Sequence, residues 1–136
     1  MTPSWNCRVS KMELTLHTSQ GLLLVRAVTQ RYMTIGENDY SSSLILLPDA
    51  IQSDWGITAS EQLTGEHASL LLKHRPELVI LGTGTRLVFP RQEFNYTLMR
   101  NGVGCEVMDT RAACRTYNVL ASDGRRVLGA FIQVAD

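Results

Sequence analysis

The sequence has no excess of charge of either sign. Its 13 Lys and Arg residues balance its 13 Asp and Glu residues, and no run of one charge occurs along the 136 residues. Domains that bind DNA, RNA or anionic membranes concentrate Lys and Arg on one face, which attracts the phosphates of the partner. The charge balance therefore argues against a nucleic-acid partner.

Long apolar runs and cysteine pairs are also missing. No stretch approaches the ~20 apolar residues that cross a bilayer, and residues 1–11 contain no apolar segment that would serve as a secretory signal. The cysteines Cys7, Cys105 and Cys114 are odd in number and lack the Cys-x-x-Cys spacing of zinc sites. We therefore expect a cytoplasmic protein without a membrane span, in which Cys105 and Cys114 are reduced core residues.

Signatures of catalysis and cofactor binding are absent as well. Neither a Gly-x-Ser-x-Gly elbow nor a His-Glu-x-x-His motif occurs, and Gly82-Thr-Gly84 lacks the rest of a nucleotide-binding loop. His67 and His74 share one face of an expected helix, but seven residues of helix separate them by about 10 Å, too far for one metal ion. The sequence predicts no metal and no cofactor, and gives no sign of an enzyme.

The length and the apolar content fit one domain. With 136 residues, of which 44% are hydrophobic, the chain matches the common size of a single compact domain. Residues 1–11 have no periodicity and are expected to form a flexible N-terminal arm. We expect residues 12–136 to form a single α/β domain.

The first third of this domain is predicted to be rich in β-strands. Met12–His17 alternates apolar and polar residues and is expected to pair with Leu22–Val28 as a hairpin. Short strands are expected at Tyr32–Ile35 and Ser43–Leu47, the second ended by a proline, and Asp49–Ser60 is expected to be a loop.

The remainder reads as strand, helix, strand, helix, strand after one leading helix. The predicted strands are Leu78–Leu81, Val103–Met108 and Arg126–Val134. The apolar runs Leu78–Leu81 and Glu106–Met108 lack alternation, so we expect them to be interior strands that are buried on both faces. The leading helix should begin near Ser60–Thr64 and end before Pro76, the second should be opened by Pro90 and followed by Gly102, and the third should be capped by Asp109. The residues expected on the inward face are Leu63, Leu70 and Leu71 of the first helix, Phe94 and Leu98 of the second, and Ala113, Tyr117, Leu120 and Ala121 of the third. In the first helix they share that face with His67 and His74, which are expected to be partly buried or surface residues.

One candidate site follows from this order of elements. If the strands that end at Leu81 and Met108 are parallel neighbours, the loops after them emerge side by side, at the edge where open α/β sheets usually hold ligands. Glycine N–H groups, threonine hydroxyls and arginine charge at the start of the third helix would suit a small anion. The candidate ligand-binding residues are Gly82, Thr83, Gly84, Thr85, Asp109, Thr110, Arg111 and Arg115. The alternative is that the glycines only make the turn and that Asp109 only caps the helix.

Several segments resemble the Mth938-like family, also called DUF498. The resemblance rests on Tyr40–Pro48, Trp55, Leu78–Gly84, Pro90 and, above all, Gly104–Leu120 with its Met-Asp-Thr-Arg sequence, and it covers roughly Met12 to Val134. It implies a small bacterial member with a three-layer Mth938-like α/β fold, in which a mixed β-sheet has flanking helices and an N-terminal β-rich part. It also implies an unknown activity for bacterial members, whereas eukaryotic relatives include a mitochondrial assembly factor for respiratory complex I and a cytoplasmic protein associated with adipocyte differentiation.

Two functional hypotheses remain from the sequence. We favour a non-catalytic protein-interaction or assembly-factor-like module with a protein partner, because no catalytic constellation is present and because the resemblance implies one. The alternative is a binder or enzyme that acts on a small anionic metabolite at the Gly82–Thr85 and Asp109–Arg111 loops. The sequence names neither the partner nor the oligomeric state.

Overall fold

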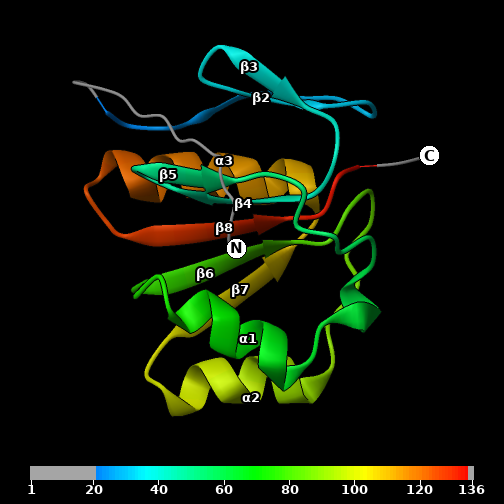
Figure 1. Cartoon of the computed structure of the whole chain (residues 1–136), viewed down its shortest axis with the longest axis vertical. Helices are drawn as coiled ribbons and strands as arrows, with labels where there is room; N and C mark the ends of the chain where they lie inside the picture. Colours follow the sequence, from blue (N-terminus) through cyan, green and yellow to red (C-terminus); the bar gives the residue numbers. More distant parts are fainter. Residues whose placement is uncertain (1–20, 135–136) are drawn as a thin grey trace.

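The central layer of the protein is a five-stranded mixed sheet, seen in the computed structural model, which describes residues 21–134 (Figure 1). The strand order is β5-β4-β8-β6-β7, and β8 is parallel to β6 but antiparallel to β4. The strands are β4 (Leu44–Leu47), β5 (Ala50–Gln52), β6 (Leu78–Gly82), β7 (Gly104–Met108) and β8 (Val127–Phe131). All four residues of β4 and all five of β8 are buried, because layers cover both faces of the sheet.

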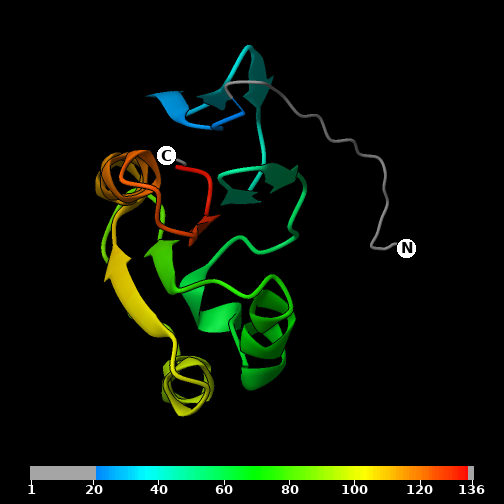
Figure 2. The ribbon, with the colours of Figure 1, turned by 90° about the vertical axis from the view of Figure 1, so that its left-hand side faces the viewer.

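Helices α1 (Gly65–Leu72) and α2 (Gln92–Arg100) cover one face of this sheet (Figure 2). A short 3₁₀ helix, η1 (Ser60–Gln62), precedes α1. The core on this side combines apolar side chains of both helices with those of β4, β6 and β8; its fully buried members include Leu63, Ala68, Val79, Leu81, Phe94, Leu98, Leu128 and Ala130.

The opposite face is covered by helix α3 (Thr110–Ser122) and by a small antiparallel sheet of three strands. These strands are β1 (Val25–Val28), β2 (Met33–Ile35) and β3 (Asn38–Tyr40). The second core lies here and joins side chains of the small sheet to those of α3, β4 and β8. At its centre the Tyr117 ring meets Phe131 edge-on, with 5.8 Å between the ring centroids.

Side chains of α3 hold the small sheet through hydrogen bonds to its backbone. The Asn118 amide accepts from Val25 N at 2.9 Å and donates to Val25 O at 2.8 Å, as a neighbouring strand would. The Tyr117 hydroxyl donates to Leu23 O at 3.0 Å, and the Arg111 guanidinium donates to Val28 O at 2.6 Å. The polar residues of α3 thus fix the position of β1.

The α/β fold class, the mixed sheet and the N-terminal β-rich part are confirmed, but three details of that part differ from expectation. Asn38–Tyr40 forms β3, which was not among the expected strands; the residues Gly36–Asp39 have the composition of a turn, but the turn needs only Gly36 and Glu37. Ala50–Gln52 forms β5 inside the expected loop Asp49–Ser60, since Pro48 and Asp49 make the turn of a hairpin with β4. Leu22–Val28 contributes β1, which pairs with β2; the expected strand Met12–His17 and the expected arm 1–11 lie outside the described residues.

The helices and strands predicted for the second half of the chain are mostly confirmed, but the exposure of some residues and the start of α2 differ from expectation. The expectation that Glu106–Met108 is an interior strand buried on both faces was wrong, because β7 is an edge strand in which Glu106 is exposed and Val107 and Met108 are only half-buried. Leu70 points outward with 55% of its side chain exposed, and Leu120 is only partly buried. Helix α2 begins at Gln92, two residues after Pro90, with Arg91 as its N-cap.

Candidate functional site

The two loops of the expected site lie side by side. Strands β6 and β7 are parallel neighbours, and their loops are joined by two backbone hydrogen bonds of 2.9 Å each. Thr83 N donates to Met108 O, and Thr110 N donates to Gly84 O. The structure therefore brings the glycine loop to the start of α3, as the order of elements predicted.

The hydroxyl of Thr110 is fully engaged within the fold. Thr110 is completely buried, accepts a hydrogen bond from Gly84 N at 2.8 Å and donates one to Ile132 O at 2.6 Å. This side chain links three segments, the loops after β6 and β8 and the first turn of α3. Its hydroxyl is thus part of the scaffold of the site.

Thr83 and Asp109 also have partners in their own segments. The Thr83 hydroxyl donates to Arg86 O at 2.5 Å and accepts from Val88 N at 3.1 Å, which shapes the loop that leads to α2. The Asp109 carboxylate accepts from Ala112 N at 3.0 Å and so caps α3. Both contacts match the alternative in which these residues make the turn and the cap.

The two glycines are required by geometry. Gly84 has a backbone φ of +99°, a left-handed conformation that residues other than glycine rarely adopt. A Cβ on Gly82 would come within 2.9 Å of the Thr110 hydroxyl oxygen and 3.0 Å of the Thr110 Cα. Glycine at position 82 therefore allows α3 to begin directly against β6.

The arginines and Thr85 lie at the exposed margin of this cluster. The Arg111 guanidinium reaches away to Val28 O of β1, while Arg115 and Thr85 are exposed. The structure thus gathers Gly82, Thr83, Gly84, Asp109 and Thr110 in one place and directs Arg111 elsewhere. That this cluster binds an anion stays a prediction.

The two described cysteines occupy the cores on opposite sides of the sheet. Burial raises the pKa of the Cys105 thiol to about 12, and the nearby Glu106 carboxylate adds to the effect. Burial likewise raises the pKa of Cys114 to about 12, although the nearby positive charges of Arg115 and Arg111 act to lower it. A thiol with so high a pKa carries almost no thiolate at neutral pH and is a poor nucleophile.

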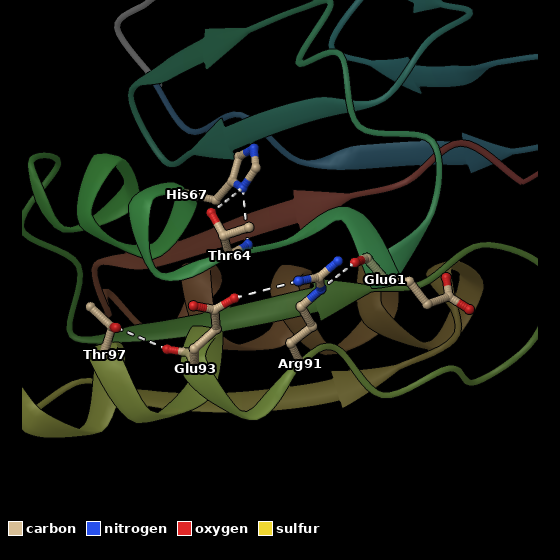
Figure 3. Close-up of polar contacts among 6 residues, drawn as sticks. All are labelled: Glu61, Thr64, His67, Arg91, Glu93 and Thr97. Carbon is tan, nitrogen blue, oxygen red and sulfur yellow. Dashed lines mark hydrogen bonds and ion pairs between the residues drawn. The ribbon is translucent and has the colours of Figure 1, made fainter.

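Polar contacts around the start of α1 are structural (Figure 3). His67 Nδ1 accepts from Thr64 N at 3.0 Å, so the imidazole helps to cap α1.

Burial lowers the pKa of His74, and the charge of Arg126 lowers it further. Among residues 21–134, no three His, Cys, Asp or Glu side chains are grouped so that they could hold a metal ion.

An exposed apolar segment lies between β6 and the end of α2 and was not predicted from the sequence. Leu87, Phe89, Tyr96 and Met99 are each more than half exposed. Tyr96 and Met99 help to line an open hollow of about 480 Å³ on α2. The signal was present, because α2 carries apolar residues on its outward side as well as at Phe94 and Leu98.

Comparison with known proteins gives consistent matches over most of the chain. Residues 25–132 match the model of a family described as "Protein of unknown function (DUF498/DUF598)". A mouse protein named NADH dehydrogenase [ubiquinone] 1 alpha subcomplex assembly factor 3 is 32% identical over 108 residues, which are 78% of this chain and 57% of the mouse protein. The chain spans less than two thirds of the length of the curated assembly-factor relatives that it matches first.

Solved structures show the same fold. A protein from Xanthomonas campestris is 36% identical, with a TM-score of 0.75 over 88% of this chain and 92% of that one. A Mth938-like domain from Bordetella pertussis is 28% identical, with a TM-score of 0.73 over 92% of this chain and 94% of that one. None of the helices within residues 21–134 has the length and apolar character needed to span a bilayer.

Proposed function

The chain belongs to the DUF498 family of Mth938-like proteins, and on this premise we propose that it is a non-catalytic protein-interaction module of the assembly-factor type. The mouse relative is named as an assembly factor for NADH dehydrogenase, and most of the present chain aligns with it. We extend the assembly role, but not the mitochondrial setting, to this chain. Its partner would be a subunit or another assembly protein, met in the cytoplasm.

The observation that carries this proposal is the exposure of large apolar side chains in the segment that leads into and through α2. Phe89 and Met99 are each 67% exposed, and Tyr96 is 61% exposed. Exposed apolar patches on soluble proteins commonly mark sites of protein association, because burying them against a partner removes apolar surface from water. Aromatic residues and methionine are also enriched at protein interfaces.

Affinity capture with a matched pair of variants tests the proposal. We expect the tagged chain to retain a stoichiometric protein from the lysate of the cells that produce it, and Tyr96→Glu to lose that protein. Val119→Glu is the control, because Val119 of α3 is equally exposed, at 62%, but lies on the other side of the sheet. If no protein is retained, or if both variants lose it equally, an interaction through this segment is wrong.

The second candidate function is binding of a small anion at Gly82–Thr85 and Asp109–Arg111. It is favoured by the position of these loops beyond the carboxyl ends of two parallel strands. It is weakened by the engagement of the Thr83 and Thr110 hydroxyls within the fold. Phosphate and citrate should raise the melting temperature, and Arg115→Gln should reduce that rise, if this candidate is correct; unchanged melting at saturating anion would exclude it.

A further inference from the structure

Within residues 21–134, strand β7 forms an open edge of the central sheet. Among the described strands it pairs with β6 alone, at the end of the strand order. The bond from Thr83 N to Met108 O directs the backbone of Met108 toward β6. Because successive residues of a strand direct their N–H and C=O groups to opposite sides, those of Cys105 and Val107 are directed to the open edge.

Helix α2 flanks this edge. Its side toward α1 is closed, since a Cβ on Gly65 would lie 3.1 Å from the Thr97 hydroxyl oxygen. Figure 2 shows that β7 lies on the side of α2 that is away from α1. Asn95 lies two residues before Thr97 and so, by helix geometry, projects to roughly the opposite side of the helix, away from α1. Asn95 and Met99 line the open hollow on this flank.

One polar atom on this flank has no partner among the described residues. The side-chain oxygen of Asn95 is buried without a hydrogen bond. A buried acceptor left without a donor costs free energy, which a ligand with an N–H group would recover. This flank of α2 thus has an exposed apolar side chain, Met99, and a buried acceptor without a donor, the side-chain oxygen of Asn95.

We propose that the β7 edge and the adjacent flank of α2 bind an extended segment of a partner protein, which adds to the sheet as one more strand. An extended backbone supplies the alternating donors and acceptors that the Cys105 and Val107 backbone groups require. This inference rests on the proposed interaction function and specifies how the partner is held. It assigns the interface to the sheet edge and not to the loops at Gly82–Thr85.

The side chains of β7 define the chemistry of that segment. Cys105 and Val107 pack toward the core beneath α1 and α2, so the partner residues beside them face α2 and should be apolar. Glu106 is exposed on the other side of the strand. A partner residue opposite Glu106 should therefore be Lys or Arg, because opposite charges across neighbouring strands are stabilising.

A second copy of this chain fits the edge less well. If two copies paired antiparallel along the whole of β7, Glu106 would lie opposite Glu106 of the other copy. Like charges directly opposite each other on neighbouring strands are destabilising. The observed charge therefore favours a different protein with alternating apolar and basic residues.

Amide exchange measured by NMR on the full chain tests this mode of binding. The probe is a capped seven-residue peptide that alternates lysine and valine, and its control has the same composition with the valines in one block. We expect the alternating peptide to slow exchange of the Cys105 and Val107 amides, and the block peptide to leave them unchanged. Equal effects of the two peptides, or protection that rises with protein concentration in the absence of peptide, would overturn the proposal.

A charge swap gives the decisive comparison. Glu106→Lys should weaken binding of the lysine–valine peptide by a factor of roughly two to five and favour a glutamate–valine peptide instead. Glu66→Lys makes the same change of charge on an exposed position of α1 and should alter neither preference. Met99→Ala should weaken both peptides, whereas Val119→Ala should not. If Glu66→Lys changed the preference between the two peptides as much as Glu106→Lys, the effect would reflect the overall charge of the protein and not a pair across neighbouring strands. That result would overturn the proposal.

The capture experiment distinguishes a failure of this inference from a failure of the proposed function. If Glu106→Lys and Val107→Pro still retain the partner that Tyr96→Glu loses, the sheet-edge mode is wrong while the interaction function stands. Val107→Pro removes a donor that is directed away from β6, so the ladder between β6 and β7 is preserved. If the parent chain captures nothing, the interaction function itself fails.

Discussion

The absence of a side chain at Gly129 decides how Phe131 fits into the core of the protein. A Cβ at position 129 would lie 2.3 Å from the far end of the Phe131 ring. That ring is fully buried and lies edge-on to Tyr117, so the surrounding core restricts how far it can shift. Gly129→Ala should therefore lower the free energy of unfolding by about 1–3 kcal/mol, the range for overpacked cores, measured by urea denaturation.

Gly104 provides the matched control on the edge strand. There a Cβ would meet only Leu78 Cδ1 at 3.5 Å, an ordinary contact. Gly104→Ala should leave stability unchanged or raise it by less than about 1 kcal/mol, because alanine restricts the unfolded chain. Equal effects at the two positions would mean that the Phe131 ring yields easily.

The two buried thiols give a prediction that depends on pH. Because burial holds the pKa of Cys105 and Cys114 at about 12, both should react slowly with a thiol reagent at pH 8 in the folded Cys7→Ser variant and rapidly in urea. Below about pH 7 these thiols are almost entirely protonated in both the folded and the unfolded state. As the pH rises from there toward 12, the unfolded thiols ionise first, so the free energy of unfolding should fall. Rapid labelling of both thiols in the native protein would contradict their burial.

At the scale of elements, one amide side chain connects α3 to the small sheet. Asn118→Ala removes both hydrogen bonds to Val25 and should cost about 1–3 kcal/mol. The loss should be local, with faster amide exchange in β1 and β2 and unchanged exchange in β6 and β8. Val119→Ala, at the exposed neighbouring position, is the control; uniform acceleration in all strands would show that the small sheet does not open separately.

The elements that the sequence predicted well are those with strong local signals. Asp109 caps α3 as expected, and Gly102 follows α2 with a φ of +78°. The short strands β3 and β5 were missed because three residues carry too little pattern and because Pro48 was taken as an end of β-structure when it forms a turn within a hairpin. Burial of β7 was overestimated, since an apolar run does not reveal whether its strand lies at the centre or at the edge of a sheet.

The candidate site was predictable in its position but not in its bonding. Topology alone placed Gly82–Thr85 beside Asp109, because parallel neighbouring strands end at the same edge. The hydrogen-bond partners of the Thr110 hydroxyl could not be predicted from the sequence. Ile132 follows a third strand, β8, and no local sequence pattern fixes the position of that strand in the sheet. The open edge of β7 was missed for the same reason.

At the scale of the molecule, the two cores share the strands that separate them. Leu98, on the inward side of α2, is fully buried, and Leu98→Ala should lower the free energy of unfolding by about 2–5 kcal/mol. Because β6 and β8 contribute to both cores, the whole domain should unfold in one step at a lower urea concentration. In a Trp5→Phe background, fluorescence of Trp55 and far-UV circular dichroism should give the same midpoint. Leu120→Ala, at a half-buried position, should shift this midpoint less; separate midpoints for the two signals would mean that the faces unfold independently.

The position of β8 has a consequence for synthesis on the ribosome. This strand is the last to be translated among those described, yet it lies between β4 and β6 in the middle of the sheet. Until Val127–Phe131 emerges, β4 with β5 and β6 with β7 are two separate half-sheets, each with an unpaired edge that is prone to aggregate. The nascent chain therefore holds exposed edges until its last described strand is made, and this protein should depend on ribosome-associated chaperones more than its small size suggests.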